Sequence, residues 1–211
     1  MISARDALES LREGNRRFVA DSLSREGVGL HARRTELATG QEPFAAILGC
    51  SDSRVPVEIV FDQGLGDLFV IRVAGNIVAP SLIGSVEFAA QRFGTRLVVV
   101  LGHSRCGAVL AALEEGAPAE GQSRNLNSIV ERVRASIAEA SATAPSDDPE
   151  DRVKRAVRAN IRSSARQLRH GSEVIERLER EEGLVVVGAE YSLESGIVDF
   201  FDTVPEGGRG R

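Results

Sequence analysis

Two short polar clusters in this chain combine side chains that bind metals and activate water. The first is Cys50-Ser51-Asp52-Ser53-Arg54, in which a thiol, a carboxylate and a guanidinium occupy every second position. The second is His103-Ser104-Arg105-Cys106, in which an imidazole precedes a thiol by three residues. Because the chain contains only 2 cysteines, one in each cluster, a single site could use both of them.

Two thiolates and one imidazole suit tetrahedral zinc, and three protein ligands with an open fourth position are typical of a catalytic zinc site. Other interpretations remain open at this point. The cysteines could be buried thiols beside a core histidine, with Asp52 and Arg54 paired in an ordinary turn. A redox pair is less favoured because no Cys-x-x-Cys motif is present.

The segments before the two clusters indicate where the clusters lie. Phe44–Leu48 and Leu97–Leu101 are short and wholly apolar, and one glycine separates each from its cluster. Such runs are typical of strands buried on both faces of a parallel sheet. Because α/β sheets bind ligands outside the carboxyl ends of their strands, both clusters are expected at the same edge.

Further strands are predicted at Leu68–Val73, Leu184–Ala189 and Ile197–Phe201. Helical patterns cover residues 3–20, 30–38, 55–60, 80–93, 108–115, 122–140, 151–170 and 172–182. This alternation predicts an α/β fold with a mostly parallel central sheet of about four parallel strands plus an antiparallel edge strand, flanked by helices.

The length of 211 residues fits a single domain, residues 1–211. Within it, residues 1–40 form an N-terminal helical arm that starts with a capping box at Ser3. Its apolar stripe must pack on this subunit's sheet or on a neighbour's. Residues 141–150 are predicted to be a surface linker, and residues 205–211 a disordered tail.

Composition excludes several classes of function. A formal net charge of −5 gives no general attraction to nucleic acid or to an anionic membrane. No apolar stretch approaches the ~20 residues that span a bilayer. The basic segment 151–170 lacks aromatic residues and is interpreted as a helix with a solvated face. The charged helical start favours a cytoplasmic protein.

The segments Cys50-Ser51-Asp52-Ser53-Arg54-Val55-Pro56 and Gly102-His103-Ser104-Arg105-Cys106-Gly107 resemble the two signature motifs of the β-class carbonic anhydrases. The segment from Gly66 to Asn76 is similar to the one that joins those motifs in the family. The resemblance implies reversible hydration of carbon dioxide to bicarbonate and a proton, by attack of a zinc-bound hydroxide. It also implies one Zn²⁺ per subunit.

By the same resemblance, each site residue has an expected role. The zinc ligands are Cys50, His103 and Cys106, and the catalytic dyad is Asp52 with Arg54. Asp52 is also a possible fourth zinc ligand in a closed, inactive state. Residues expected to bind substrate are Gln41, Phe69, Ala74 and Gly107. Family sites lie at a dimer interface, which implies a homodimer or a homotetramer.

Alternatives of function also remain. A relative that hydrolyses carbonyl sulfide or carbon disulfide would use the same motifs, and a non-catalytic zinc module would need neither Asp52 nor Arg54. One branch of the family traps an inhibitory bicarbonate in a pocket that contains a Trp. Arg72 and Tyr191 match other parts of that pocket, but Ile47 stands at the position of the Trp here. We therefore predict that no bicarbonate is held beside Arg72.

Overall fold

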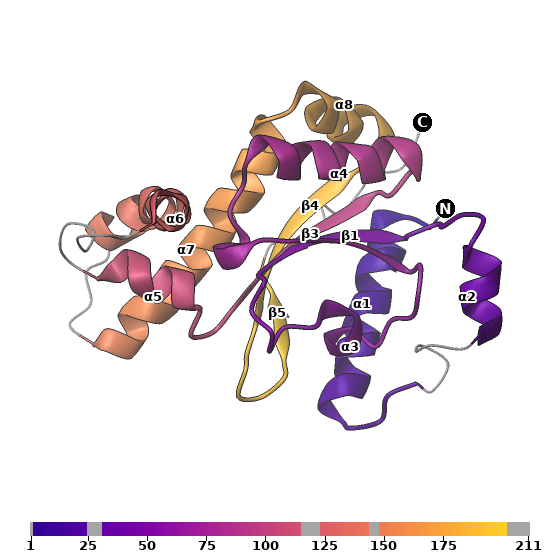
Figure 1. Cartoon of the computed structure of the whole chain (residues 1–211), viewed down its shortest axis with the longest axis horizontal. Coiled ribbons are helices and arrows are strands. Elements are labelled where there is room, and N and C mark those ends of the chain that lie inside the picture. Colours follow the sequence, from indigo (N-terminus) through magenta and orange to yellow (C-terminus); the bar gives the residue numbers. More distant parts are fainter. Residues whose placement is uncertain (1, 25–30, 115–122, 144–147, 202–211) are drawn as a thin grey trace.

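The computed structural model describes residues 2–24, 31–114, 123–143 and 148–201. Five strands form one sheet in the order β2-β1-β3-β4-β5. The first four strands are parallel, and β5 is antiparallel to β4 (Figure 1). The strands are β1 (Ala45–Gly49), β2 (Leu68–Arg72), β3 (Leu97–His103), β4 (Val185–Tyr191) and β5 (Val198–Phe200). The predicted fold class is therefore confirmed.

The central strands are buried along their whole length, as their apolar sequences predict. Every residue of β1 and β3 is buried. β3 is longer than predicted, because Gly102 and His103 still pair with Glu190 and Tyr191 of β4. His103 is consequently part of the sheet itself and not of the loop that follows.

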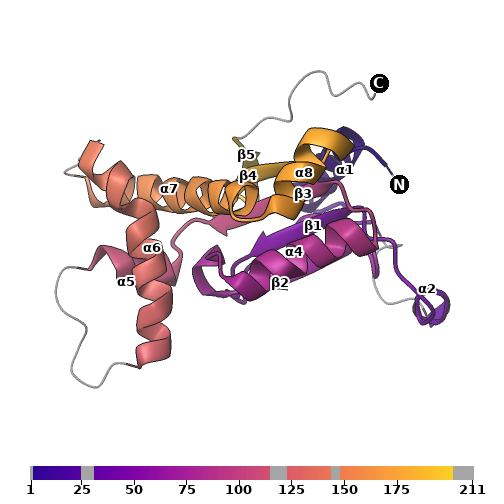
Figure 2. The same cartoon turned by 90° about the horizontal axis from the view of Figure 1, so that it is seen from above.

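Helices cover both faces of the sheet (Figures 1 and 2). One core packs the sheet against α4 (Pro80–Arg92), α7 (Pro149–His170) and α8 (Glu173–Glu182). The opposite core packs it against α1 (Ala4–Val19) and α3 (Val57–Val60). The helices α5 (Gly107–Leu113) and α6 (Arg124–Thr143) pack beside α7, beyond the sheet (Figure 2).

The N-terminal arm divides into two parts. Ser3 caps α1, since its Oγ accepts a hydrogen bond from the Asp6 backbone N–H at 3.1 Å. Leu8 and Leu11 are buried in the core that α1 shares with this chain's own sheet. By contrast, α2 (His31–Leu37) has no buried residue. The arm therefore packs its first helix on its own subunit and leaves its second helix on the surface.

Two local features differ from the sequence prediction. The helix predicted over residues 55–60 begins only at Val57, and Pro56 is its N-cap. After β2 the chain forms a short 3₁₀ helix, η1 (Ala74–Asn76), where only the end of a strand was expected. This turn requires a glycine, because Gly75 has φ of +71°.

Some predictions concern parts of the chain without a structural description. The predicted tail, residues 205–211, lies outside the described residues, as does the middle of the predicted linker, residues 144–147. The single-domain assignment stays a prediction. Among the described residues, no helix combines the length and the apolar character that a membrane crossing requires.

Candidate metal centre

The fold brings the two polar clusters together at one edge of the sheet. Cys50 follows β1 directly, His103 is the last residue of β3, and Cys106 is the N-cap of α5. β1 and β3 are parallel neighbours with Gly49 opposite Leu101. As a result, the ligand atoms of Cys50, His103 and Cys106 all lie within 4.8 Å of one another.

The chemistry of this cluster fits a zinc ion. Cys50, Cys106 and His103 are only 4%, 2% and 0% exposed. His103 Nδ1 lies 3.0 Å from the Ser104 carbonyl oxygen, so Nδ1 carries the hydrogen and Nε2 offers a lone pair. Nε2 has no hydrogen-bond partner within the described part of the chain. A buried, unpartnered imidazole nitrogen beside two sulfurs is the donor set of a zinc site.

The two thiols compete for one negative charge. The two sulfurs lie close together, and the interaction between them lowers the pKa of Cys50 and raises that of Cys106. The Gly75 backbone N–H also stabilises the Cys50 thiolate, since it donates a hydrogen bond to Cys50 Sγ at 3.3 Å. A divalent cation would end this competition, because both cysteines would bind it as thiolates.

Asp52 lies beside the candidate ligands and is paired with Arg54. Arg54 Nε and Nη2 donate to Asp52 Oδ1 and Oδ2 at 2.9 and 2.7 Å. The Arg54 backbone N–H also donates to Oδ1, at 2.9 Å. These bonds, the side-chain bond foremost, hold the pKa of Asp52 well below its usual range. Asp52 Oδ2 lies 3.8 Å from His103 Nε2, so an ionised carboxylate adjoins the cluster.

Arg72 fixes the backbone of the same loop. Its Nε donates to the Cys50 carbonyl oxygen at 3.0 Å, and its Nη2 donates to the Asp52 carbonyl oxygen at 2.7 Å. The Ser51 N–H adds a bond to the Val73 carbonyl oxygen at 3.3 Å. The sequence prediction about Arg72 concerned only the absence of a bicarbonate beside it. It missed this contact, because no sequence pattern shows which carbonyl groups an arginine reaches.

Of the residues expected to bind substrate, two lie close to the cluster. Ala74 precedes Gly75, whose backbone N–H donates to Cys50 Sγ at 3.3 Å. Gly107 follows Cys106 and is exposed at the start of α5.

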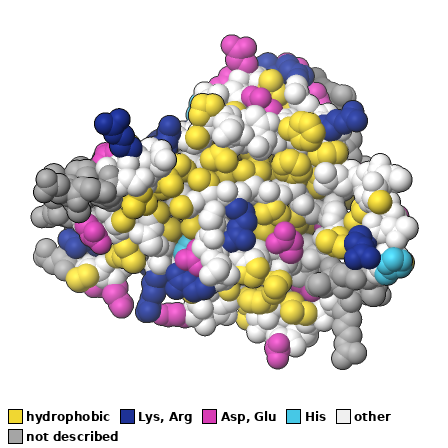
Figure 3. All heavy atoms as spheres, viewed as in Figure 1, with side chains coloured by type: hydrophobic (Ala, Val, Ile, Leu, Met, Phe, Trp, Pro, Cys, Tyr) yellow, Lys and Arg dark blue, Asp and Glu magenta, His cyan; other side chains and the backbone are white. Residues whose placement is uncertain are grey.

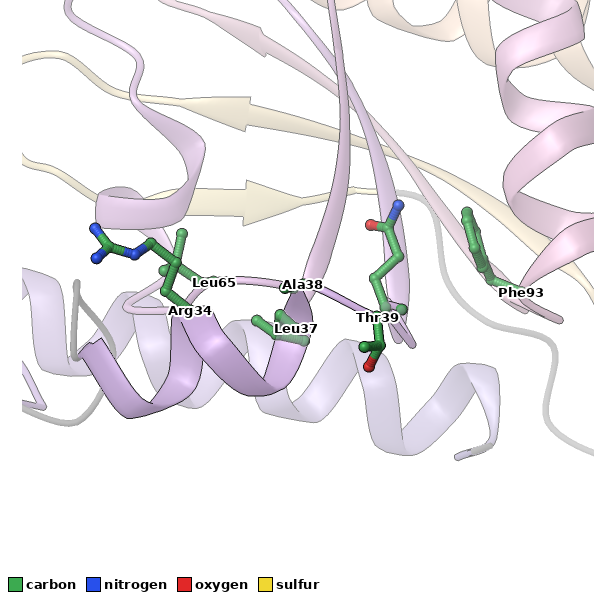
Figure 4. A pocket seen from close by; sticks show the side chains of 9 residues that line it. Arg34, Leu37, Ala38, Thr39, Leu65 and Phe93 are labelled. Carbon is green, nitrogen blue, oxygen red and sulfur yellow. The ribbon is translucent and has the colours of Figure 1, made fainter.

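The other two lie elsewhere in this subunit. Phe69 pairs with Ala46 in the sheet. At ~3.3 Å per residue, that position is roughly 13 Å along the strand from Cys50. Gln41 lies before the amino end of β1, whereas Cys50 lies after the carboxyl end of the same strand. It lines an open hollow of about 650 Å³. Figure 4 shows this hollow between Arg34 and Leu65 on one side and Phe93 on the other.

Fold and site together define an α/β protein with a candidate metal centre at the carboxyl edge of a parallel sheet. The family model described as carbonic anhydrase matches residues 45–198. Carbonic anhydrase 2 of Mycobacterium tuberculosis is 38% identical over 193 residues, which cover 90% of this chain and 89% of that protein. A carbonic anhydrase of Mycolicibacterium smegmatis is 47% identical over 134 residues, covering 62% of this chain and 63% of the relative.

Solved structures agree with these matches. A β-carbonic anhydrase of Aspergillus fumigatus superposes with a TM-score of 0.73 at 27% identity, covering 96% of this chain and 92% of its own. One of two tetrameric β-carbonic anhydrases of Sordaria macrospora gives a TM-score of 0.70 at 28% identity, covering 81% and 86%. This chain therefore belongs to the β class of the carbonic anhydrase family. It is an enzyme of that family.

Proposed function

We propose that this protein catalyses the reversible hydration of carbon dioxide to bicarbonate and a proton, with one Zn²⁺ per subunit held by Cys50, His103 and Cys106. One observation carries the proposal: three ligand atoms lie within 4.8 Å of one another, with the Asp52 carboxylate 3.8 Å from His103 Nε2. Zinc, when bound, supplies a strong nucleophile at ordinary pH by lowering the pKa of water.

In this proposal Asp52 orients the attacking water and does not remove its proton. A general base works best when its pKa lies near the working pH, and the pKa of Asp52 is far too low for that. Its Oδ2 instead accepts the hydrogen of the nucleophile and fixes the direction of the oxygen lone pair. Arg54 holds the carboxylate in place and would keep it from binding the metal. Without Arg54, Asp52 would be free to become a fourth ligand and block the site.

The substrate pocket needs a second subunit. Ala74 and Gly107 adjoin the ligands in the same chain, whereas Gln41 and Phe69 do not. We therefore assign the substrate-binding roles expected for these last two residues to the neighbouring chain, that is, to Gln41 of the partner subunit and Phe69 of the partner subunit. The mechanism then requires at least a homodimer, and the Sordaria macrospora enzymes are described as tetrameric.

The surface of the chain supports such an assembly. β2 forms one edge of the sheet. Beside it, Phe69, Phe88 and Phe93 pack together with ring centroids 5.6–6.2 Å apart. Phe88 is 53% exposed. Figure 3 shows hydrophobic side chains gathered in a band along and below α4. A large apolar area of this kind is typical of a protein interface. Cytoplasmic location stays a prediction.

The test is a stopped-flow assay of carbon dioxide hydration, run with metal analysis of the same preparation. We expect about one zinc per chain and a hydration rate that disappears with a chelator and returns with Zn²⁺. Zinc without hydration would favour a non-catalytic zinc module. Turnover of carbonyl sulfide or carbon disulfide in place of carbon dioxide would favour the related hydrolases.

A further inference from the structure

A buried asparagine is connected to the candidate metal ligand Cys50 through the backbone of a single residue, Gly75. Asn160, on α7, is 1% exposed. Its Nδ2 donates a hydrogen bond to the Gly75 carbonyl oxygen at 2.8 Å. Burying an amide costs free energy unless the amide is hydrogen-bonded, so a core position for Asn160 needs a reason.

Gly75 connects this asparagine to the metal centre. Its carbonyl oxygen accepts from Asn160, and its own N–H donates to Cys50 Sγ at 3.3 Å. The backbone of Gly75 is left-handed, with φ of +71° and ψ of 17°. A Cβ here would lie 3.0 Å from both Ala108 Cβ and Val133 Cγ2. Glycine is therefore the residue that fits here. Because glycine is also conformationally permissive, the turn keeps this one conformation only if another group holds it.

The helix that carries Asn160 is itself packed tightly against the ligand strand. A Cβ on Gly102 would lie 2.5 Å from Cγ1 of Ile161, the residue after Asn160. α7 therefore contacts β3 backbone one residue before His103. This close packing fixes the position of Asn160 relative to β3, the strand that ends at His103.

We propose that Asn160 is a positioning residue for the metal centre, which holds Gly75 so that the Gly75 N–H donates to the Cys50 sulfur. This inference rests on the proposed zinc function. A hydrogen bond to a ligating thiolate draws electron density from the sulfur and fixes its direction. Loss of such an outer contact typically weakens metal binding about 10–100-fold.

The deciding variant is Asn160→Leu, which keeps the number of side-chain heavy atoms but removes the donor. Ser164→Ala is the matched control. Ser164 lies one turn further along α7, is 1% exposed, and its Oγ has no hydrogen-bond partner among the described residues. Asn160→Ser, a smaller change, replaces Asn160→Leu if that variant does not fold.

The full-length proteins are titrated with Zn²⁺ and, separately, loaded with Co²⁺. We expect Asn160→Leu to bind Zn²⁺ about 10–100-fold more weakly than wild type. We also expect its sulfur-to-cobalt charge-transfer band at longer wavelength, because a sulfur without the N–H bond gives up an electron more easily. Ser164→Ala should match wild type in both measurements.

Three results would overturn the inference. A folded Asn160 variant with an unchanged band and unchanged affinity would show that the contact does not influence the metal. Equal losses in Asn160→Leu and Ser164→Ala would indicate general damage to α7. A wild-type chain that binds neither metal would refute the proposed zinc function as well as this inference. The first two results, by contrast, would refute only the role of Asn160.

Discussion

Arg54 holds both carboxylate oxygens of Asp52, with Nε 2.9 Å from Oδ1 and Nη2 2.7 Å from Oδ2. Arg72 binds the backbone carbonyl oxygen of the same Asp52 at 2.7 Å. One arginine thus fixes the side chain and another fixes the main chain. The direction of the Asp52 carboxylate toward His103 depends on both contacts.

Replacing Arg54 should reduce activity through its effect on Asp52. In Arg54→Ala the carboxylate loses its bidentate partner and becomes free to approach the metal. We expect the hydration rate, measured by stopped flow, to fall about 10–100-fold. Arg54→Lys, which keeps the charge but not the paired donors, should lie between wild type and Arg54→Ala. Near-full activity in Arg54→Ala would exclude this role.

The Asp52–Arg54 pair should also make stability depend on pH. Arg54 lowers the pKa of Asp52 in the folded protein. The carboxylate therefore contributes stability that is complete above the unfolded pKa of about 3.9 and is lost as the pH falls below it. We expect the difference in unfolding free energy between wild type and Asp52→Asn to be constant above about pH 5 and to shrink below about pH 4. Denaturant titrations at several pH values measure it, and a difference that grows on acidification would contradict the assignment.

Activity should increase on the alkaline side of neutrality. Two thiolates cancel the charge of Zn²⁺, so the metal should acidify water less than it does in three-histidine sites, where the pKa of that water is about 7. We expect the turnover rate to rise with pH above about 7. A flat profile between about pH 6 and about pH 9 would count against a centre with two thiolates.

Two defective variants should complement each other if the pocket is shared. Cys50→Ser removes a metal ligand, and Gln41→Ala removes an amide that the proposal assigns to the other subunit's site. After subunit exchange, mixed dimers contain one site with intact Cys50 and Gln41 of the partner subunit. We expect the mixture to exceed the mean activity of the two separate variants. Activity equal to that mean would place Gln41 outside a shared site.

Bicarbonate should show no cooperative inhibition. Arg72 uses its Nε and Nη2 for the carbonyl oxygens of Cys50 and Asp52, and Ile47 offers no indole donor. We expect simple hyperbolic dependence of the dehydration rate on bicarbonate concentration. A sigmoidal curve that Arg72→Ala abolishes would show that an ion does bind there.

Much of the fold could be predicted from the sequence, because its signals are local. Apolar runs such as Leu97–Leu101 indicate buried strands, and Ser3 with Asp6 marks the start of α1. The predicted end of a strand differs from the observed end where pairing extends the strand beyond its apolar run, as it does at Gly102 and His103. A sequence does not show how far a neighbouring strand continues to pair.

For the site, the sequence by itself determined which groups are present: two thiols, an imidazole, a carboxylate and two arginines. The types and spacing of these residues favoured metal binding with a carboxylate nearby. Only the tertiary structure decided which of them meet. It directs Arg72 to the loop carbonyl groups and Asn160 to Gly75, and it separates Gln41 from Cys50 by the length of a strand. The physical reason is that these contacts join residues distant in the chain through sheet register and helix packing, which no local pattern encodes.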